Sequence, residues 1–363
     1  MEYMHGGDIY RNKVMYDFSV NVNPLGMPER CMEAAKRGVE LCTRYPDWKG
    51  EKLCRAIAAA EGVSEEQVVP GNGAAELLYA LLFYLRPGKA LVLAPSFGEY
   101  EAAVTASGGE CRFRKLREEE DFRLGEDFPD EISEGTGMVI LCNPNNPTGA
   151  VIEKELLLRI AGKCEDAGTW LCVDECFLPF TEREEELTMK HCLEKFSHLI
   201  VLRAFTKIYG MPGLRLGYAM AAGSVPAGIR RCMQPWNTSL PAQMAGLEAL
   251  QSRGFIADTV KLVRKERCFL CRELADMPGE NVEKVYPSEA NFLLLRGRVD
   301  LYQRMLERGF LIRDCGNYRG LEREADSTRG YFRIAVRTHA ENRALADCLR
   351  QLKSITPLQA AGE

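Results

Sequence analysis

A lysine at the end of an apolar strand is the residue whose surroundings point most directly to chemistry. Lys207 follows the apolar stretch 199–204 and lies in a turn bounded by glycine and proline, with Arg215 eight residues further on. Catalytic groups of α/β proteins collect in turns at strand ends. A single lysine is nevertheless far more often a surface residue, so the interpretation depends on its companions.

The companions are polar groups at the ends of two other predicted strands. Residues 143–149 read Asn-Pro-Asn-Asn-Pro-Thr-Gly and follow the apolar stretch 138–142, and Asp174 and Glu175 end the stretch 170–175. The carboxyl ends of parallel strands meet at one edge of a sheet, which is the expected crevice for a ligand. Residues 71–75, Gly-Asn-Gly-Ala-Ala, precede a predicted helix, and free backbone N–H groups at a helix start can bind a phosphate.

The order of these motifs resembles the fold-type I pyridoxal-phosphate enzymes of the class I and II aminotransferase family, from about residue 17 to about residue 352. The resemblance implies an α/β fold of the PLP-dependent transferase type and pyridoxal 5′-phosphate as the cofactor. That cofactor needs a lysine amine for its Schiff base, an acid that keeps the ring nitrogen protonated, and a phosphate cup. Lys207, Asp174 and the helix start at Gly73, Ala74 and Ala75 would supply them.

Further cofactor contacts follow from the same resemblance. Asn146 would hydrogen-bond the ring O3′ as the third catalytic residue, and Phe97 would stack on the ring. Thr206 and Arg215 would hold the phosphate, whose oxygens match the arginine fork. Tyr45, in the Arg-Tyr-Pro-Asp element at 44–47, would reach the cofactor phosphate of a partner subunit, which implies a homodimer with shared active sites.

Two positions depart from the pattern of many relatives. Ala204 stands three residues before the lysine, where many have serine or threonine, and Phe177 stands three after the aspartate, where many have tyrosine. From the loss of one phosphate donor and one O3′ donor we expect either weaker cofactor binding or a higher pKa of the internal aldimine. Neither change removes an essential group.

The substrate is suggested by a further set of cations. By the family resemblance, Arg333 binds the substrate carboxylate. The stretches 5–7, 17–26, 313–320 and 333–339 resemble one branch of the family, the threonine-phosphate decarboxylases, which make aminopropanol phosphate for the corrinoid nucleotide loop. A phosphorylated amino acid brings a phosphate and a carboxylate, and His5, Arg319 and Arg337 are the additional candidate partners. The choice between phosphothreonine and phosphoserine stays open, since a single methyl separates them.

Two alternatives remain. The sister branch, histidinol-phosphate aminotransferase, shares the motifs around Tyr45, Asn146 and Lys207, whereas the His-Gly-Gly at 5–7 and Arg337 favour the decarboxylase. Both reactions start from the same substrate–cofactor adduct, so residue types alone hardly separate them. A non-catalytic sensory domain that binds the cofactor is the remote alternative, and it would carry a DNA-binding helix-turn-helix ahead of the motifs found here.

Composition excludes several classes of protein. The 363 residues predict about two domains. The chain has 47 Lys and Arg residues against 52 Asp and Glu residues, a net charge of 47 − 52 = −5, so we expect no nucleic-acid partner. The longest apolar run, residues 77–85, is too short for a membrane span and the N-terminus lacks a signal-peptide core, which predicts a cytoplasmic protein.

Fourteen cysteines are then expected to be reduced. The Cys-x-x-Cys at 268–271 lies in a helical pattern, so no metal site is predicted.

The predicted elements explain how the site is positioned. Between residues 50 and 204, strand patterns at 89–94, 138–142, 170–174 and 199–204 alternate with helical ones, which predicts βαβ units and a mostly parallel sheet. A helix over 241–274, strands near 292 and 333, and a closing helix predict a smaller α+β domain. We expect an N-terminal arm at 1–40 joining the small domain, a large cofactor-binding domain at 41–240 and a small domain at 241–363. The polar stretch 117–130 is expected to be a solvated connection.

Overall fold

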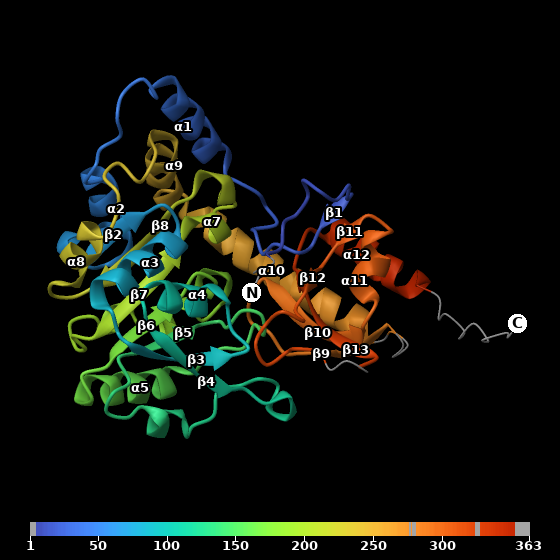
Figure 1. The fold of residues 1–363 in the computed structure, drawn as a ribbon. Coiled ribbons are helices and arrows are strands. Elements are labelled where there is room, and N and C mark those ends of the chain that lie inside the picture. Colours follow the sequence, from blue (N-terminus) through green and yellow to red (C-terminus); the bar gives the residue numbers. More distant parts are fainter. Residues whose placement is uncertain (1–4, 276, 278–280, 324–326, 353–363) are drawn as a thin grey trace, which may run out of the picture.

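A seven-stranded sheet forms the centre of the larger half of the molecule (Figure 1). The computed structural model describes residues 5–275, 277, 281–323 and 327–352. The strand order is β2-β8-β7-β6-β5-β3-β4. The pairs β2–β8 and β8–β7 are antiparallel, and the pairs from β7 through β6, β5 and β3 to β4 are parallel. The predicted α/β class with a mostly parallel sheet is confirmed. The strands are β2 (Val68–Gly71), β3 (Lys89–Ala94), β4 (Glu110–Lys115), β5 (Met138–Cys142), β6 (Trp170–Asp174), β7 (Leu199–Ala204) and β8 (Gly217–Ala221).

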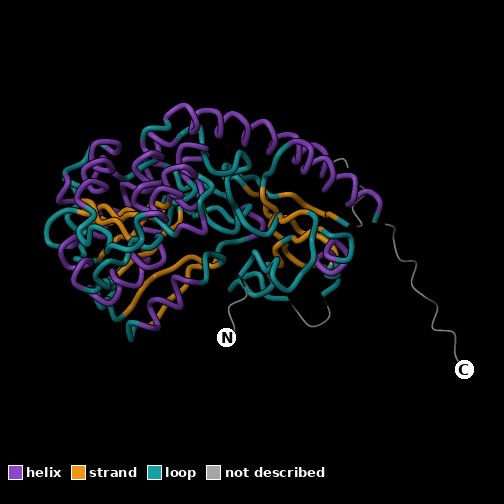
Figure 2. Tube along the Cα trace, turned by 90° about the horizontal axis from the view of Figure 1, so that it is seen from above, coloured by secondary structure: helices purple, strands orange, loops and turns teal. Residues whose placement is uncertain are grey.

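Helices cover both faces of this sheet (Figure 2). The central strands are therefore mostly apolar, and every residue of β5, β7 and β8 is buried. One core lies between the sheet and α3, α4 and α8, and the other extends from the opposite face into the second sheet. The helices of this half are α1 (Glu29–Glu40), α2 (Glu51–Glu61), α3 (Ala74–Leu85), α4 (Glu99–Ala106), α5 (Lys154–Asp166), α6 (Glu184–Leu187), α7 (Phe205–Ile208), α8 (Val225–Arg231) and α9 (Leu240–Leu250).

A second, antiparallel sheet of four strands lies beside the first, in the order β12-β13-β10-β9. The long helix α10 runs from the larger half across to this sheet (Figure 1). From the N-terminal arm, β1 pairs in parallel with β11, and Ala335 N donates to Phe18 O. The domain boundaries predicted at residues 41 and 241 stay a prediction. The remaining elements are β1 (Tyr16–Asp17), α10 (Arg253–Ala275), β9 (Val282–Val285), β10 (Phe292–Arg298), α11 (Leu301–Leu306), β11 (Phe310–Leu311), β12 (Arg313–Asp314), β13 (Arg329–Ala335) and α12 (His339–Gln351).

Three features differ from the sequence-based expectation. The strands β2, β4 and β8 were not predicted. Of the two edge strands, β2 is short and β4 is largely polar. The helix expected over 241–274 is interrupted at residues 251–252, giving α9 and α10. The stretch 117–130 is not simply a solvated connection, because Phe122 and Phe128 are buried in the core.

That stretch also anchors the second sheet to the first. The Glu118 carboxylate accepts hydrogen bonds from Tyr331 Oη at 2.7 Å, from Arg296 Nη1 at 2.9 Å and from Tyr286 Oη. Phe122 packs edge-on against both tyrosine rings, with centroids 5.1 and 5.9 Å away. The polar residues of 117–130 therefore join the two sheets rather than facing only water.

The described ranges contain neither a membrane-spanning helix nor a cluster of metal-ligating side chains. No helix there is both long and apolar enough to cross a membrane. Within the same ranges, histidine, cysteine and acidic side chains form no cluster of three that could hold a metal ion.

Candidate active site

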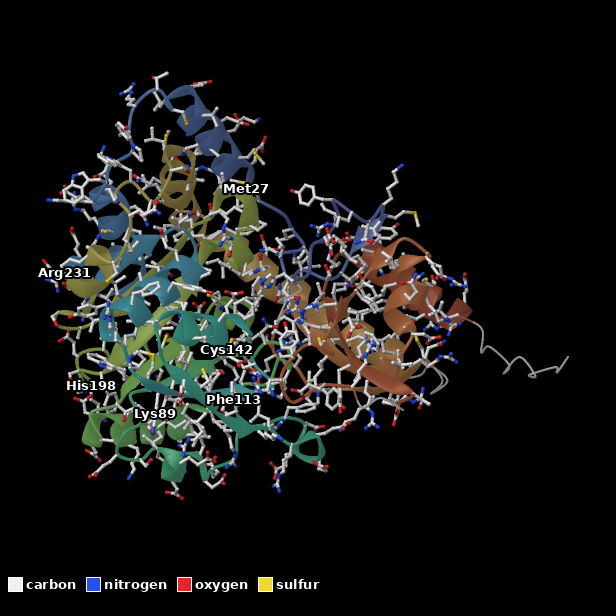
Figure 3. All side chains as sticks on the ribbon, viewed as in Figure 1. Met27, Lys89, Phe113, Cys142, His198 and Arg231 are labelled. Carbon is white, nitrogen blue, oxygen red and sulfur yellow. The ribbon has the colours of Figure 1, made fainter. Side chains whose placement is uncertain are left out.

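A cavity of about 400 Å³ lies where the two sheets and the arm meet. It opens at the carboxyl ends of β5, β6 and β7, where the parallel topology brings Cys142, Asp174 and Ala204 side by side. Figure 3 labels Cys142 at this edge. Of the residues singled out from the sequence, the cavity is lined by His5, Ala74, Ala75, Phe97, Asn146, Asp174, Thr206, Lys207, Arg215 and Arg333.

Lys207 lies on the single-turn helix α7, directly after β7. Its backbone is held by a hydrogen bond from Asn23 N to Lys207 O at 3.1 Å. Removal of water around its amine lowers the pKa of Lys207 to about 8, and the positive charges of Arg333 and Arg215 act in the same direction. A fraction of the amine is therefore neutral and nucleophilic near neutral pH.

Asp174 is held rigidly at the end of β6. Its two carboxylate oxygens accept from Tyr100 Oη at 2.8 Å and from Cys176 N at 3.0 Å, and only 8% of the residue is exposed. Burial and the neighbouring Asp174 charge raise the pKa of Tyr100 well above its usual value, so this hydroxyl stays a donor. The arrangement presents a buried, oriented carboxylate to the cavity.

The start of α3 forms the other end of the cavity. Gly73 has φ +88° and no side chain caps the helix, so the first N–H groups at Ala74 and Ala75 are available to an anion. A Cβ on Gly73 would lie 2.5 Å from Nη2 of Arg215, which shows how closely this guanidinium approaches the helix start. Glycine is thus required here both for its φ and for space. A phosphate fits this combination of backbone donors and arginine.

These observations test whether the chain suits pyridoxal phosphate. An amine, a buried carboxylate and an anion-binding helix start all face one cavity large enough for a small aromatic cofactor. Phe97 lines the same space and packs edge-on against Tyr100 with ring centroids 5.7 Å apart. The residues present fit the group.

Two arginines face each other across the second sheet at the same cavity. Arg313 of β12 and Arg333 of β13 are direct cross-strand partners, both are 6% exposed, and both line the cavity. Arg333 Nη2 donates to Ser19 O at 2.8 Å and Nη1 donates to Asn146 Oδ1, while its buried Nε has no partner. In the described part of the chain, Arg333 forms no ion pair with a carboxylate. Like charges directly opposite one another are destabilising, so this pair is suited to an anion.

Sequence reasoning assigned no role to Arg313, although it lies in the stretch 313–320 that was singled out. Its importance comes from the β12–β13 register, which places it opposite Arg333. Tyr100 and Tyr318 were also missed as cavity residues. For Tyr100, the only available signal was its position three residues after Phe97 on the predicted helix.

Four of the predicted site residues do not line this cavity. Gly73 underlies it through its contact with Arg215. Arg319 lines an adjoining cavity of about 240 Å³, where Nη2 donates to Glu101 Oε1 at 2.6 Å. Arg337 pairs with Glu341 at 2.7 Å, beside the capping box of α12. Tyr45 is exposed and packs on the exposed Trp236, with ring centroids 4.6 Å apart.

Comparison with known proteins decides the family. The model of the family "Aminotransferase class I and II" matches residues 13–349. The chain belongs to the class I and II aminotransferase family. As a member of this family it is a pyridoxal-phosphate-dependent enzyme, which confirms the predicted family and cofactor. The roles predicted for individual site residues stay predictions.

Within the class I and II aminotransferase family, relatives of two kinds are similar to this chain. It is 35% identical to a threonine-phosphate decarboxylase of Salmonella typhimurium, with 97% of this chain and 98% of that protein covered. It is 32% identical to a histidinol-phosphate aminotransferase of Caldanaerobacter subterraneus, with 93% of each covered. The crystal structure of an L-threonine-O-3-phosphate decarboxylase from Porphyromonas gingivalis superposes with a TM-score of 0.80 at 25% identity, covering 92% of this chain and 98% of that one.

Proposed function

We propose that this chain decarboxylates an O-phosphorylated amino acid, L-threonine O-3-phosphate or L-serine O-phosphate. The product would be an amino-alcohol phosphate used in corrinoid (cobalamin) biosynthesis. The Salmonella relative, with 35% identity over nearly its whole length, supports this activity. The observation that carries the proposal is the facing pair Arg313 and Arg333, which adds two cations to the cavity beyond the phosphate site at the start of α3.

The charge of the substrate distinguishes this reaction from the main alternative. A phosphorylated amino acid brings a carboxylate and a phosphate at once, and two arginines match two anionic groups. Histidinol phosphate has a phosphate but no carboxylate. Histidinol-phosphate aminotransferase remains the second candidate, because the Caldanaerobacter relative is 32% identical to this chain.

Each residue would have a distinct task. Bound pyridoxal phosphate supplies the electron sink for the pair left on the α-carbon when carboxylate departs as CO₂. Asp174 would hold a proton at the ring nitrogen, Asn146 would hydrogen-bond the ring O3′, and Arg333 would orient the carboxylate. Lys207 Nζ, with its pKa lowered to about 8, can carry a proton to the α-carbon after CO₂ has left. Thr206, Arg215 and the start of α3 would hold the cofactor phosphate.

His5, Arg313 and Arg319 would bind the substrate phosphate. His5 and Arg313 line both the larger and the smaller cavity, and Arg319 lines the smaller one. These residues therefore meet at the junction of the two cavities. Support for Arg337 comes from the sequence resemblance alone.

The chain would act as a homodimer in which Tyr45 reaches the cofactor phosphate of the other subunit. Tyr45 is exposed and is not among the residues that line the cavity of its own chain, which supports this proposal. Trp236 beside it is also exposed, and paired surface aromatics are typical of interfaces.

The test is a direct assay of the purified, cofactor-loaded enzyme. Phosphothreonine, phosphoserine and histidinol phosphate with 2-oxoglutarate are supplied separately, and CO₂ and amino transfer are both measured. We expect CO₂ from at least one phosphoamino acid. Fast amino transfer from histidinol phosphate without CO₂ release from either phosphoamino acid would assign the chain to the second candidate.

A further inference from the structure

Two carboxylates on one helix hold two of the side chains that the substrate phosphate would need. Glu99 Oε1 lies 3.1 Å from Nε2 of His5, and Glu101 Oε1 accepts from Arg319 Nη2 at 2.6 Å. Both glutamates lie in the first turn of α4, whereas His5 comes from the arm and Arg319 from the loop after β12. The short helix α4 therefore contacts two segments that are distant in the sequence, the arm and the loop after β12.

These ion pairs border the junction of the two cavities. Glu99 lines the larger cavity and Glu101 the smaller, and His5 lines both. The Arg319 guanidinium also lies over the Phe113 ring, 4.3 Å from its centroid, and this cation–π contact helps to position the side chain. Figure 3 labels Phe113 on β4, at the side of the large sheet facing the second one.

A phosphate monoester would compete with these carboxylates for His5 and Arg319. It carries a charge of about −1.5 to −2 and three acceptor oxygens near neutral pH, against one charge and two oxygens for a carboxylate. The side chains of His5 and Arg319 are 57% and 40% exposed, and charged pairs of that exposure are weak. A hydroxyl on the substrate carries no charge, so it would leave both pairs in place.

We propose that Glu99 and Glu101 are positioning residues that hold His5 and Arg319 until a dianionic phosphate replaces them. The inference rests on the proposed function and adds to it two groups that set the affinity for the phosphorylated substrate. The glutamates act through His5 and Arg319 and are not catalytic residues.

The test compares Glu101→Gln with Glu322→Gln in the cofactor-loaded enzyme. Glu322 lines the same smaller cavity and is exposed, but its carboxylate accepts from Gly320 N instead of pairing with Arg319. We expect Glu101→Gln to lower KM for the phosphoamino acid about three- to tenfold with kcat little changed. The same variant should bind inorganic phosphate more tightly by a similar factor in calorimetric titration, and Glu322→Gln should do neither. Glu99→Gln combined with Glu101→Gln should widen the preference for phosphothreonine over threonine, because threonine has no phosphate that must displace these carboxylates.

The possible outcomes are separable. If Glu101→Gln and Glu322→Gln give the same KM and the same phosphate affinity while the unaltered enzyme releases CO₂, this inference is wrong and the proposed function stands. If the unaltered enzyme neither releases CO₂ from a phosphoamino acid nor binds phosphate, the proposed function itself fails. Should Glu101→Gln not fold, Glu101→Asp keeps the charge but shortens its reach, and the same direction of change is expected from it.

Discussion

At the scale of single residues, burial of the Lys207 amine makes the amine more reactive but lowers the stability of the folded chain. Its pKa is about 8 in the folded chain against 10.5 for an unburied lysine. Between those two values the unfolded chain holds a proton that the folded chain lacks, so the free energy of unfolding rises with pH across that window. Below pH 8 both states are protonated, and the penalty of burying the charge is fully present, on the order of 3 kcal/mol.

We therefore expect Lys207→Met to stabilise the cofactor-free protein at pH 7, by up to about 3 kcal/mol. The gain should shrink as the pH rises from 8 to 9.5, and urea unfolding at several pH values measures it. Lys261→Met, at an exposed position of α10, is the control and should change stability by less than about 0.5 kcal/mol. Equal stability of the Lys207 variant and the parent at pH 7 would contradict the burial argument.

Lys207 should also be the attachment point of the cofactor. The purified protein is expected to be yellow, and borohydride reduction followed by peptide mass analysis should find the phosphopyridoxyl group on Lys207. A label on another lysine would refute the assignment of the site.

Arg313 is a candidate substrate-binding residue that only the tertiary structure revealed. Arg313→Ala should weaken binding of the phosphoamino acid by about 1.5 to 3 kcal/mol, roughly ten- to a hundredfold, because a charge-assisted hydrogen bond is lost. Cofactor absorbance should be unchanged, since in our proposal Arg215 and the start of α3 would hold the cofactor phosphate. Arg337→Ala is the informative comparison, because that side chain pairs with Glu341 outside the cavity lining. We expect the KM of the Arg337→Ala variant to change less than threefold. An equal loss of substrate affinity in both variants would mean that Arg337 binds the substrate.

At the scale of elements, the turn at 118–120 decides how the second sheet is held against the first. Partial burial raises the pKa of Glu118, but hydrogen bonds from Tyr286, Tyr331 and Arg296 outweigh this and lower it below its usual value. The carboxylate thus stays charged at neutral pH. The stability that it contributes is present above the unfolded pKa of about 4.5 and is lost as the pH falls through the lower folded value.

Glu118→Ala should lower the free energy of unfolding by about 1 to 3 kcal/mol at pH 7, because three donors lose one acceptor. Glu119→Ala, one position along and exposed, provides the matched control and should shift it by less than about 0.5 kcal/mol. The difference between the two variants should diminish below pH 4. Indistinguishable unfolding curves at pH 7 would mean that this turn does not anchor the sheet.

At the scale of the whole molecule, the arrangement of Tyr45 predicts that two chains build each site. A Tyr45→Phe chain mixed with a Lys207→Ala chain should recover activity, since each mixed dimer contains one site with both native residues. Sedimentation of the unaltered protein should give the mass of a dimer. Activities that simply average after mixing, or a monomeric mass, would contradict the shared site.

The residues at strand ends could be predicted from the sequence by itself. Apolar stretches of strand length alternating with helices imply a parallel sheet, and the ends of such strands must meet at one edge. This rule is enough to bring Lys207, Asp174 and Asn146 together, and all three line one cavity. The glycine at the start of α3 is predictable as well, because its motif is local in the chain.

Contacts between distant segments were decided only by the tertiary structure. Arg313 faces Arg333 because β12 pairs with β13 across twenty residues, and local patterning does not specify such a register. Glu118 lies in a polar stretch that is typical of a solvated loop, and its partners Tyr286 and Tyr331 lie more than 160 residues away. Equally, the Glu99 and Glu101 pairs join α4 to the arm and to the loop after β12. Periodicity along the chain reports which face of an element is buried, whereas the partner on the other side is selected by packing of the whole molecule.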